Sequence, residues 1–481
     1  MISSHLPEDG PFSAAQVCHY WRTVLISSPS LWTRFSCCNV PQTAAGLDRC
    51  GSLPIHLNLE RLISGAALRD VLHRGNEVAS LNITYTETRI PPFRLFLPHA
   101  RSLERLSVYD KSLGRGAGVR TLHEVWRDFK FPSLRELFAY RYLIPLEELN
   151  APNLVHLALE EMGSYQIITT HTILKLLRRI PLLETLLISD IEVQDDTGAS
   201  HSSIPLPHLR SIEVGGVTVL SGFIACLDFP TSTAVALRDI DITDICEDVS
   251  PDLSRAMQCV FGRIDVRCIT IATPSRSWVV SECFVRFEGV QGSLEITTGT
   301  YHCRGLKRRQ ALFSPQGILF LHKPHIKDVR ELHIAGCSVG SGRQMDHINA
   351  AMPNLISISF FRYGGPHTLE LLTPPDPPFP PFPRLRCVMI LGTESGLEEM
   401  ARERRDLGVP IKTLIIGRGP EVSKCDRLED YGVLESLVDN LWVGCPAETF
   451  EWTATGEIHN LWSPIRAPHE VGLMEIWRHH I

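Results

Sequence analysis

One segment of the sequence has residue types and spacing suited to nucleophilic catalysis. Residues 336–340 read GCSVG and fit the pattern G-x-S-x-G, with Ser338 as the nucleophile, and they follow a predicted strand at 331–334. In hydrolases this pattern places a serine on a sharp turn between a strand and a helix. The acid and the base would have to come from later in the chain, for example Asp406 and His459, and neither has a recognisable setting. The repeat described below explains a glycine-rich turn after a strand without catalysis, so we predict no catalytic residue and no enzymatic activity.

Metal and phosphate sites need spacings that this sequence lacks. His302-Cys303 and Cys37-Cys38 are adjacent pairs, whereas two thiolates on one tetrahedral zinc usually have about two to four residues between them. The phosphate-binding patterns G-x-x-x-x-G-K-[ST] and G-x-G-x-x-G are both missing from the sequence. We therefore predict no metal site and no cofactor.

The composition is that of a folded protein with a modest negative charge. Of the 481 residues, 44% are hydrophobic and 21% are charged, and the formal net charge is −7, which argues against a nucleic-acid partner. The sequence shows no run of about 18 apolar residues and no signal peptide, which predicts no membrane partner. The 14 cysteines are scattered without close paired spacing, as is typical of reduced thiols. We therefore expect a cytoplasmic or nuclear protein.

Internal repetition indicates the fold. In the repeated phrase, an apolar residue is followed by further apolar residues three and five positions later, as in Leu154, Leu157 and Leu159. The first apolar position recurs at Val78, Leu103, Leu134, Leu154, Leu183, Leu209, Leu237 and Val266, and again at Val329, Leu355, Leu385 and Ile411. Copies in the first series lie 20 to 31 residues apart, close to the length of a leucine-rich repeat. Residues 294–296 are predicted to form a degenerate strand in the interval between the two series.

Each repeat is predicted to contain one strand and one helix. Residues 169–180 and 395–407 have apolar residues on one face and charged residues on the other, as in an amphipathic helix. A unit of this size cannot bury its own apolar face, so successive units must stack into a curved α/β solenoid. We predict a leucine-rich-repeat-like solenoid over residues 41–418. A C-terminal cap over 419–481, with a helix at 428–441, is expected to cover its end.

A short apolar segment precedes the repeats. Its apolar residues at helical spacing are Ala14, Val17, Trp21, Val24 and Leu25, which predicts a helix over 14–26. Pro29 ends this helix, and Leu31 and Trp32 then offer a second apolar anchor. We predict one small core that contains Trp21, Leu31 and Trp32.

This segment resembles the F-box family. Val17-Cys18 with Trp21-Arg22 and then residues 29–32 are similar to the second half of the F-box motif, and residues 2–9 are similar to its middle. The motif of the family normally opens with a leucine-proline and a leucine-rich first helix, inside which Met1 would fall. The resemblance therefore implies an N-terminally truncated, all-α F-box module over residues 1–40. The residues that it assigns to the module's core or to adaptor binding are Leu6, Pro7, Val17, Cys18, Trp21, Leu31 and Trp32.

The resemblance also implies a function. An F-box protein of this kind is a non-enzymatic, substrate-recognition subunit of an SCF-type cullin-RING ubiquitin ligase. Its F-box binds a Skp-type adaptor, and its solenoid binds a target protein. Residues 51–59, where the repeats begin, are similar to the same region in large fungal F-box families. The alternative is a leucine-rich-repeat scaffold that binds proteins without any connection to a ligase.

The strand residue between the last two apolar positions of each copy is predicted to line the concave face of the solenoid. Phe138 and Leu187 would contribute an apolar stripe at this position, and Glu213 and Asp241 would follow as neighbouring carboxylates. Because adjacent strands lie about 4.8 Å apart, these side chains would form one surface. We predict that this surface binds the target protein.

Overall fold

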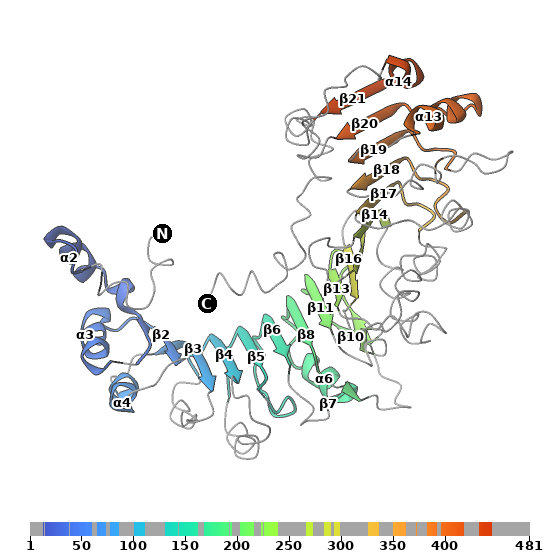
Figure 1. Cartoon of the computed structure of the whole chain (residues 1–481). Coiled ribbons are helices and arrows are strands. Elements are labelled where there is room, and N and C mark those ends of the chain that lie inside the picture. The colour runs from blue at the N-terminus through green and yellow to red at the C-terminus, as the bar shows by residue number, and fades with distance from the viewer. Residues whose placement is uncertain are drawn as a thin grey trace, which may run out of the picture. The chain divides into compact units, whose positions relative to one another are not determined.

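The computed structural model shows a mixed α/β protein in which large parallel sheets dominate and helices are few (Figure 1). The residues that the structure describes are 13, 15–37, 39–59, 65–73, 77–85, 101–110, 130–142, 144–161, 168–191, 193–194, 203–215, 223–224, 226–238, 266–272, 283–289, 293–298, 326–335, 350–361, 372, 382–391, 396–417 and 432–444. The chain divides into two compact units. Unit 1 comprises Met1–Ile212, Gly216–Val219 and Cys226–Pro230, and unit 2 comprises Glu213–Gly215, Leu220–Ala225 and Thr231–Ile481.

Short helices and one two-residue strand form the N-terminal part of unit 1. In chain order these elements are α2 (His19–Ile26), the 3-10 turn η2 (Pro29–Trp32), β1 (Arg34–Phe35) and α3 (Val40–Cys50). The helix predicted over 14–26 begins later than expected, because Cys18 has an extended backbone and its sulfur accepts the N–H of Trp21 at 3.5 Å. The helix ends at Ile26, ahead of Pro29, as predicted.

Seven strands of unit 1 form a parallel sheet in which each strand pairs with the next (Figure 1). They are β1, β2 (Ile55–Leu59), β3 (Val78–Tyr85), β4 (Arg105–Asp110), β5 (Glu136–Tyr140), β6 (His156–Glu160) and β8 (Thr185–Ser189), and β11 (Ser211–Gly215) pairs with β8. The pairing aligns the repeated phrase, so that Leu106 faces Leu137 and Leu137 faces Leu157. All three leucines are buried, because residues in register on adjacent strands point to the same face of the sheet. The strands predicted from the repeat are confirmed in this unit.

The described connections of unit 1 contain fewer helices than predicted. α4 (Gly65–His73) connects β2 to β3, and α6 (Thr170–Leu177), which confirms the helix predicted over 169–180, lies between β6 and β8. Between β5 and β6, residues 144–150 form turns instead. The prediction of one helix in every repeat is wrong here, because Pro145 and Pro152 leave too short a stretch for a helix. Two pairs of short parallel strands lie in the later connections: β7 (Ile168–Thr169) with β9 (Val193–Gln194), and β10 (Ile204–Pro205) with β12 (Leu227–Asp228).

The first strands of unit 2 do not follow one another across their sheet in chain order. They are β13 (Ala234–Arg238), β14 (Val266–Ala272), β15 (Cys283–Gly289) and β16 (Ser293–Thr298), and β16 confirms the strand predicted at 294–296. β13 pairs with β16 in parallel, β15 lies antiparallel between β16 and β14, and β14 then pairs with β17 (Glu331–Ala335). The expectation of a simple succession of parallel strands is wrong here. Only residues 290–292 join β15 to β16, whereas a parallel pair needs a crossover of about a dozen residues.

The remaining strands of unit 2 return to the predicted pattern. β17, β18 (Ser357–Phe361), β19 (Cys387–Leu391), β20 (Thr413–Gly417) and β21 (Asn440–Gly444) pair in parallel, each with the next. β21 lies within the predicted cap, and the helix expected over 428–441 is observed only as α14 (Gly432–Leu437). The segment after α14 is a strand because it contains Leu441, Trp442 and Val443, and aromatic and β-branched residues favour strands.

One helix of unit 2 is held by a buried arginine. α13 (Leu397–Asp406), predicted over 395–407, buries Arg404 completely. The guanidinium of Arg404 donates to the carbonyl oxygen of Phe382 at 3.0 Å and to that of Leu372 at 3.4 Å. Burial lowers the pKa of Arg404 to about 10. Arg404 therefore connects α13 to two backbone positions that lie far from it in the sequence.

No helix among the residues that the structure describes has the length and apolar character needed to cross a membrane.

Candidate functional site

The N-terminal part of unit 1 has a small core around Trp32. The indole N–H of Trp32 donates to the carbonyl oxygen of Leu25 at 2.8 Å, and both side chains are 2% exposed. The guanidinium of Arg49, on α3, lies 4.3 Å from the centre of the Trp32 ring. Leu31 is half-buried beside this core. Trp32 is thus the residue of the predicted core that is fully buried.

Trp21 does not share this core, and that prediction is wrong. The side chain of Trp21 is 42% exposed, whereas Leu25, one turn later on the same helix, is buried beside Trp32. Val17 and Tyr20 are each 72% exposed, and Ile26 is 45% exposed. We call Val17, Tyr20, Trp21 and Ile26 the α2 surface. Val17 precedes α2, and the other three residues are part of it. Exposed apolar side chains of this size are a common feature of protein-binding surfaces.

The other residues assigned to the F-box module are only partly placed. Cys18 is exposed and caps the N-terminus of α2. Leu6 and Pro7 lie outside the described residues, as do Ser338 and His459 of the hydrolase-like pattern. Asp406 is an exposed residue at the end of α13.

Two of the four residues of the predicted target surface are buried. Phe138 is 5% exposed and Leu187 is 3% exposed, so neither offers a surface to a partner. The ring of Tyr109, on the neighbouring strand, lies 4.9 Å from that of Phe138 and covers it. Glu213 is a half-buried residue of unit 2, and Asp241 lies outside the described residues.

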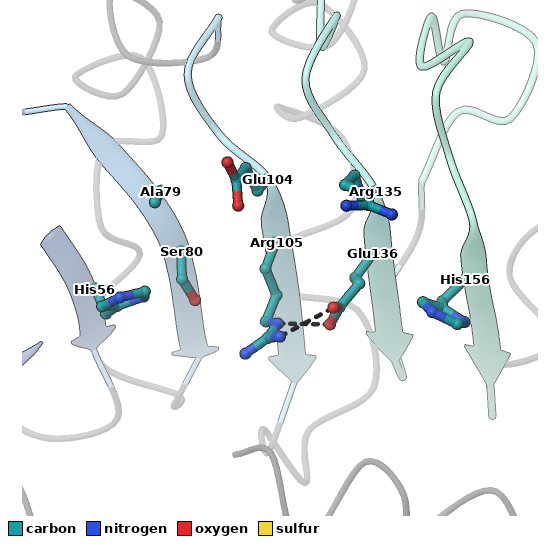
Figure 2. Close-up of a pocket in the computed structure, with 8 residues that line it drawn as sticks. All are labelled: His56, Ala79, Ser80, Glu104, Arg105, Arg135, Glu136 and His156. Carbon is teal, nitrogen blue, oxygen red and sulfur yellow. Dashed lines mark hydrogen bonds and ion pairs between the residues drawn. The ribbon is translucent and has the colours of Figure 1, made fainter. Parts of the chain in front are cut away.

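A row of polar residues lies on the side of the unit 1 sheet that also carries Phe138 and Leu187. On each strand the polar residue comes two positions before the buried one. These residues are in register on adjacent strands, in the order His56, Ser80, Arg105, Glu136, His156 and Thr185. They lie on the same side of each strand as Phe138 and Leu187, because positions two apart share a face. Five of them, from His56 to His156, line a pocket of about 240 Å³ together with Ala79, Glu104 and Arg135 (Figure 2). We call this the polar-row pocket.

An arginine–glutamate pair occupies the middle of the pocket. Arg105 Nε donates to Glu136 Oε2 at 2.5 Å, and Arg105 Nη2 donates to Glu136 Oε1 at 2.9 Å (Figure 2). The two side chains are 33% and 23% exposed, so this two-point contact is partly shielded from water. Arg105 and Glu136 largely neutralise each other.

Two histidines lie on either side of this pair. Loss of water around the ring, and then the positive charges of Arg34 and Arg105, lower the pKa of His56, although its side chain is exposed. Burial is also the main cause that lowers the pKa of His156, and its Nδ1 lies 2.7 Å from the hydroxyl oxygen of Thr185. Both imidazoles are therefore neutral at pH 7 and can act as hydrogen-bond donors and acceptors.

Two exposed charged groups border the pocket without a partner. Glu104 and Arg135 precede strands β4 and β5, and within the described part of the chain neither side chain makes a hydrogen bond or an ion pair. Arg34 lies next to His56 in the same row, one strand further along, and it also makes no hydrogen bond or ion pair with the described residues. The guanidinium groups of Arg34 and Arg135 are thus available to an anionic ligand.

The sequence contains a signal for this pocket that our prediction did not use. In each copy of the repeat, the residue directly before the second apolar position belongs to the polar row. The predicted target surface uses the residue directly after that apolar position. Both positions face the same way, so the strand period could not separate them. What separates them is the burial of the later position, to which the contact of Tyr109 with Phe138 contributes and which depends on side chains from neighbouring strands.

No protein-family model matches this sequence, and no curated protein matches it either. Among the described residues, no group of three or more histidine, cysteine, aspartate or glutamate side chains is arranged to hold a metal ion.

Proposed function

We propose that this chain is a substrate-recognition subunit of an SCF-type cullin-RING ubiquitin ligase, without enzymatic activity of its own. Residues 1–40 form its F-box module and bind a Skp-type adaptor. Residues 41–418 form a leucine-rich-repeat-like solenoid that binds a target protein, and 419–481 complete its C-terminal end. The protein works in the cytoplasm or the nucleus.

The observation that carries the proposal is the exposure of the α2 surface. The α2 helix has only eight residues, and it presents Tyr20, Trp21 and Ile26 to solvent while Leu25 anchors it to Trp32. Leaving such side chains in water is unfavourable by roughly 25 cal/mol for each Å² of apolar surface that a partner could cover. A folded module that keeps them exposed is suited to binding an apolar surface of another protein. The resemblance of residues 17–32 to the F-box motif assigns that surface to a Skp-type adaptor.

The parallel sheets support the second half of the proposal. Aligned copies of one apolar phrase on successive parallel strands are the arrangement expected of stacked repeats. Such arrays present a long row of side chains from many strands, which is a suitable surface for a protein target.

A titration of a purified Skp-type adaptor against the full chain tests the adaptor site. Val17→Ser and Tyr20→Ser change exposed side chains, so the double variant should stay folded and lose at least about tenfold in affinity, or about 1.4 kcal/mol. The matched control is Leu182→Ser with Val433→Ser, which removes two exposed apolar side chains elsewhere in the chain. This control should bind the adaptor like the wild type. Failure of the wild-type chain to bind the adaptor would leave the scaffold without a ligase connection as the better assignment.

A further inference from the structure

We propose that the polar-row pocket binds a carboxylate side chain of an acidic, extended segment of the target protein, and that binding takes up protons on His56 and His156. This inference rests on the proposed function only in assigning the ligand to a target protein. It concerns a site on β2 to β6, whereas adaptor binding concerns the α2 surface.

The size of the pocket favours one side chain over a larger ligand. Its volume of about 240 Å³ lies below the range of about 300–1,000 Å³ that is typical of pockets for drug-sized molecules and cofactors. The row from His56 to His156 crosses five strands, a distance of about 19 Å at about 4.8 Å per strand. About six residues of an extended peptide span that distance. A peptide lying along the row can therefore place one side chain in the pocket and contact the whole row.

The available charges favour a carboxylate. Arg135 is exposed beside the pocket and makes no hydrogen bond or ion pair with the residues that the structure describes. A guanidinium binds a carboxylate through two parallel hydrogen bonds. Arg105 has its partner already in Glu136, so it contributes little further attraction. Glu104 borders the same pocket and opposes a second negative charge. The pocket is therefore suited to one carboxylate rather than to a doubly charged group.

The histidines add a dependence on pH. The charged groups that act on His56 are Arg34 on β1 and Arg105 on β4, and those that act on His156 are Glu136, Glu184, Arg135 and Arg105. The charged residues that line the pocket are Arg105, Arg135, Glu104 and Glu136, so its formal charge is zero while both imidazoles are neutral. A bound carboxylate stabilises the protonated imidazoles and raises their pKa. Affinity therefore increases as the pH falls from 7.5 to 5.5, because the complex holds more protons than the free chain.

Fluorescence anisotropy with the full chain and a labelled (Gly-Glu)₄ peptide tests the proposal. Glutamate side chains have a pKa of about 4.3, so this probe stays largely ionised down to pH 5.5. We expect the probe to bind about tenfold more tightly at pH 5.5 than at pH 7.5, a change of about 1.4 kcal/mol. Labelled (Gly-Gln)₄ and (Gly-Lys)₄ should bind at least about tenfold more weakly at pH 5.5. Equal binding of the lysine peptide would overturn the proposal.

Variants separate the role of each group. Arg135→Gln should weaken binding of (Gly-Glu)₄ at least about fivefold, Glu104→Gln should strengthen it, and Arg384→Gln, an exposed control in unit 2, should leave it unchanged. The double variant His56→Gln with His156→Gln should bind with little dependence on pH. Retention of the full pH dependence by this variant would contradict proton uptake at the histidines. Displacement of the peptide by an equal concentration of free glutarate would overturn the assignment to a peptide and identify the ligand as a small dicarboxylate.

Failure of the acidic-peptide proposal can be distinguished from failure of the proposed ligase function. The adaptor titration uses variants of the α2 surface, and the peptide titration uses variants of the polar-row pocket. Loss of adaptor binding with intact peptide binding would reject only the ligase assignment. The opposite result would reject only the acidic ligand.

Discussion

Arg105 on β4 and Glu136 on β5 contact each other at two points, with Nε to Oε2 at 2.5 Å and Nη2 to Oε1 at 2.9 Å. This pair lies between the two histidines of the polar row, and its charges act on His156 in opposite directions. Glu136 raises the pKa of His156, and Arg105 lowers it. The protonation of His156 therefore depends on an ion pair formed by the two strands before it.

Glu136→Gln should lower the pKa of His156 below its wild-type value. The substitution removes a negative charge that stabilises the imidazolium and leaves the positive charge of Arg105 unbalanced. An NMR titration of the His156 ring protons measures the change. Glu398→Gln, which removes an exposed carboxylate on α13, should leave the pKa of His156 as it is. A rise in the pKa of His156 in Glu136→Gln would contradict the observed geometry.

Trp32→Ala should destabilise the N-terminal part of unit 1, and Trp21→Ala should not. Truncating a fully buried tryptophan costs about 3–5 kcal/mol, and here it also leaves the carbonyl oxygen of Leu25 without its indole donor. The 42% exposed Trp21 should contribute less than about 1 kcal/mol. Limited proteolysis and hydrogen exchange over residues 15–50 measure the difference. Equal protection of this region in wild type and Trp32→Ala would exclude Trp32 as its core residue.

Gly46→Ala should destabilise the contact between α3 and β1. A Cβ atom at position 46 would lie 2.6 Å from Cε1 of Phe35, and the Phe35 ring is buried, so it must shift within the core. Overpacking of this kind costs about 1–3 kcal/mol. The control is Gly65→Ala at the start of α4, where a new Cβ has no neighbour within 4 Å. Urea denaturation should show a lower midpoint for Gly46→Ala and an unchanged one for Gly65→Ala.

The unfolding free energy should fall on acidification from pH 7.5 to 5.5, in part through His56 and His156. Both have a pKa below the ordinary value of 6.5 in the folded chain, so the unfolded chain binds more protons as the pH drops through 6.5. Their contribution is present above pH 6.5 and is lost as the pH falls toward their folded pKa. His56→Gln with His156→Gln should lose less stability over this interval than the wild type does. Urea midpoints at the two pH values provide the test, and an identical loss in both proteins would count against it.

Arg404→Met should destabilise unit 2 by about 1–3 kcal/mol, because it removes a buried donor from two carbonyl oxygens, of which that of Phe382 keeps the backbone N–H of Leu385. The affected groups are the carbonyl oxygens of Phe382 and Leu372, which lie in a buried environment with Arg404. The matched control on the same helix is Arg402→Met, which removes an exposed pair with Glu398 and should cost only about 0.3–0.5 kcal/mol. Thermal unfolding of both variants measures the difference, and equal melting temperatures would contradict it.

Much of the strand pattern could be predicted from the sequence, because a strand that buries one face must repeat its apolar residues with a period of two. The burial of Leu106, Leu137 and Leu157 follows from that rule alone. The position of the candidate pocket does not follow from it. Whether Phe138 or Glu136 faces solvent depends on aromatic side chains of neighbouring strands. The exposure of Trp21 does not follow from periodicity either, because Trp21 and Leu25 lie four residues apart on one face of α2 and only Leu25 is buried. Periodicity identifies the face of an element, and contacts distant in sequence determine which residues on it remain exposed.

The antiparallel strand β15 gives unit 2 a different folding problem from that of a chain of like repeats. In such a chain, each strand can add to the one before it, so assembly can begin anywhere and spread through short loops. Here β13 pairs in parallel with β16, a strand that the ribosome makes about 55 residues later, once residues 266–298 have formed their hairpins. Closure of that long loop costs entropy before any pairing offsets it. During synthesis, β13 must therefore wait, with one edge unpaired, until the third strand after it has left the ribosome.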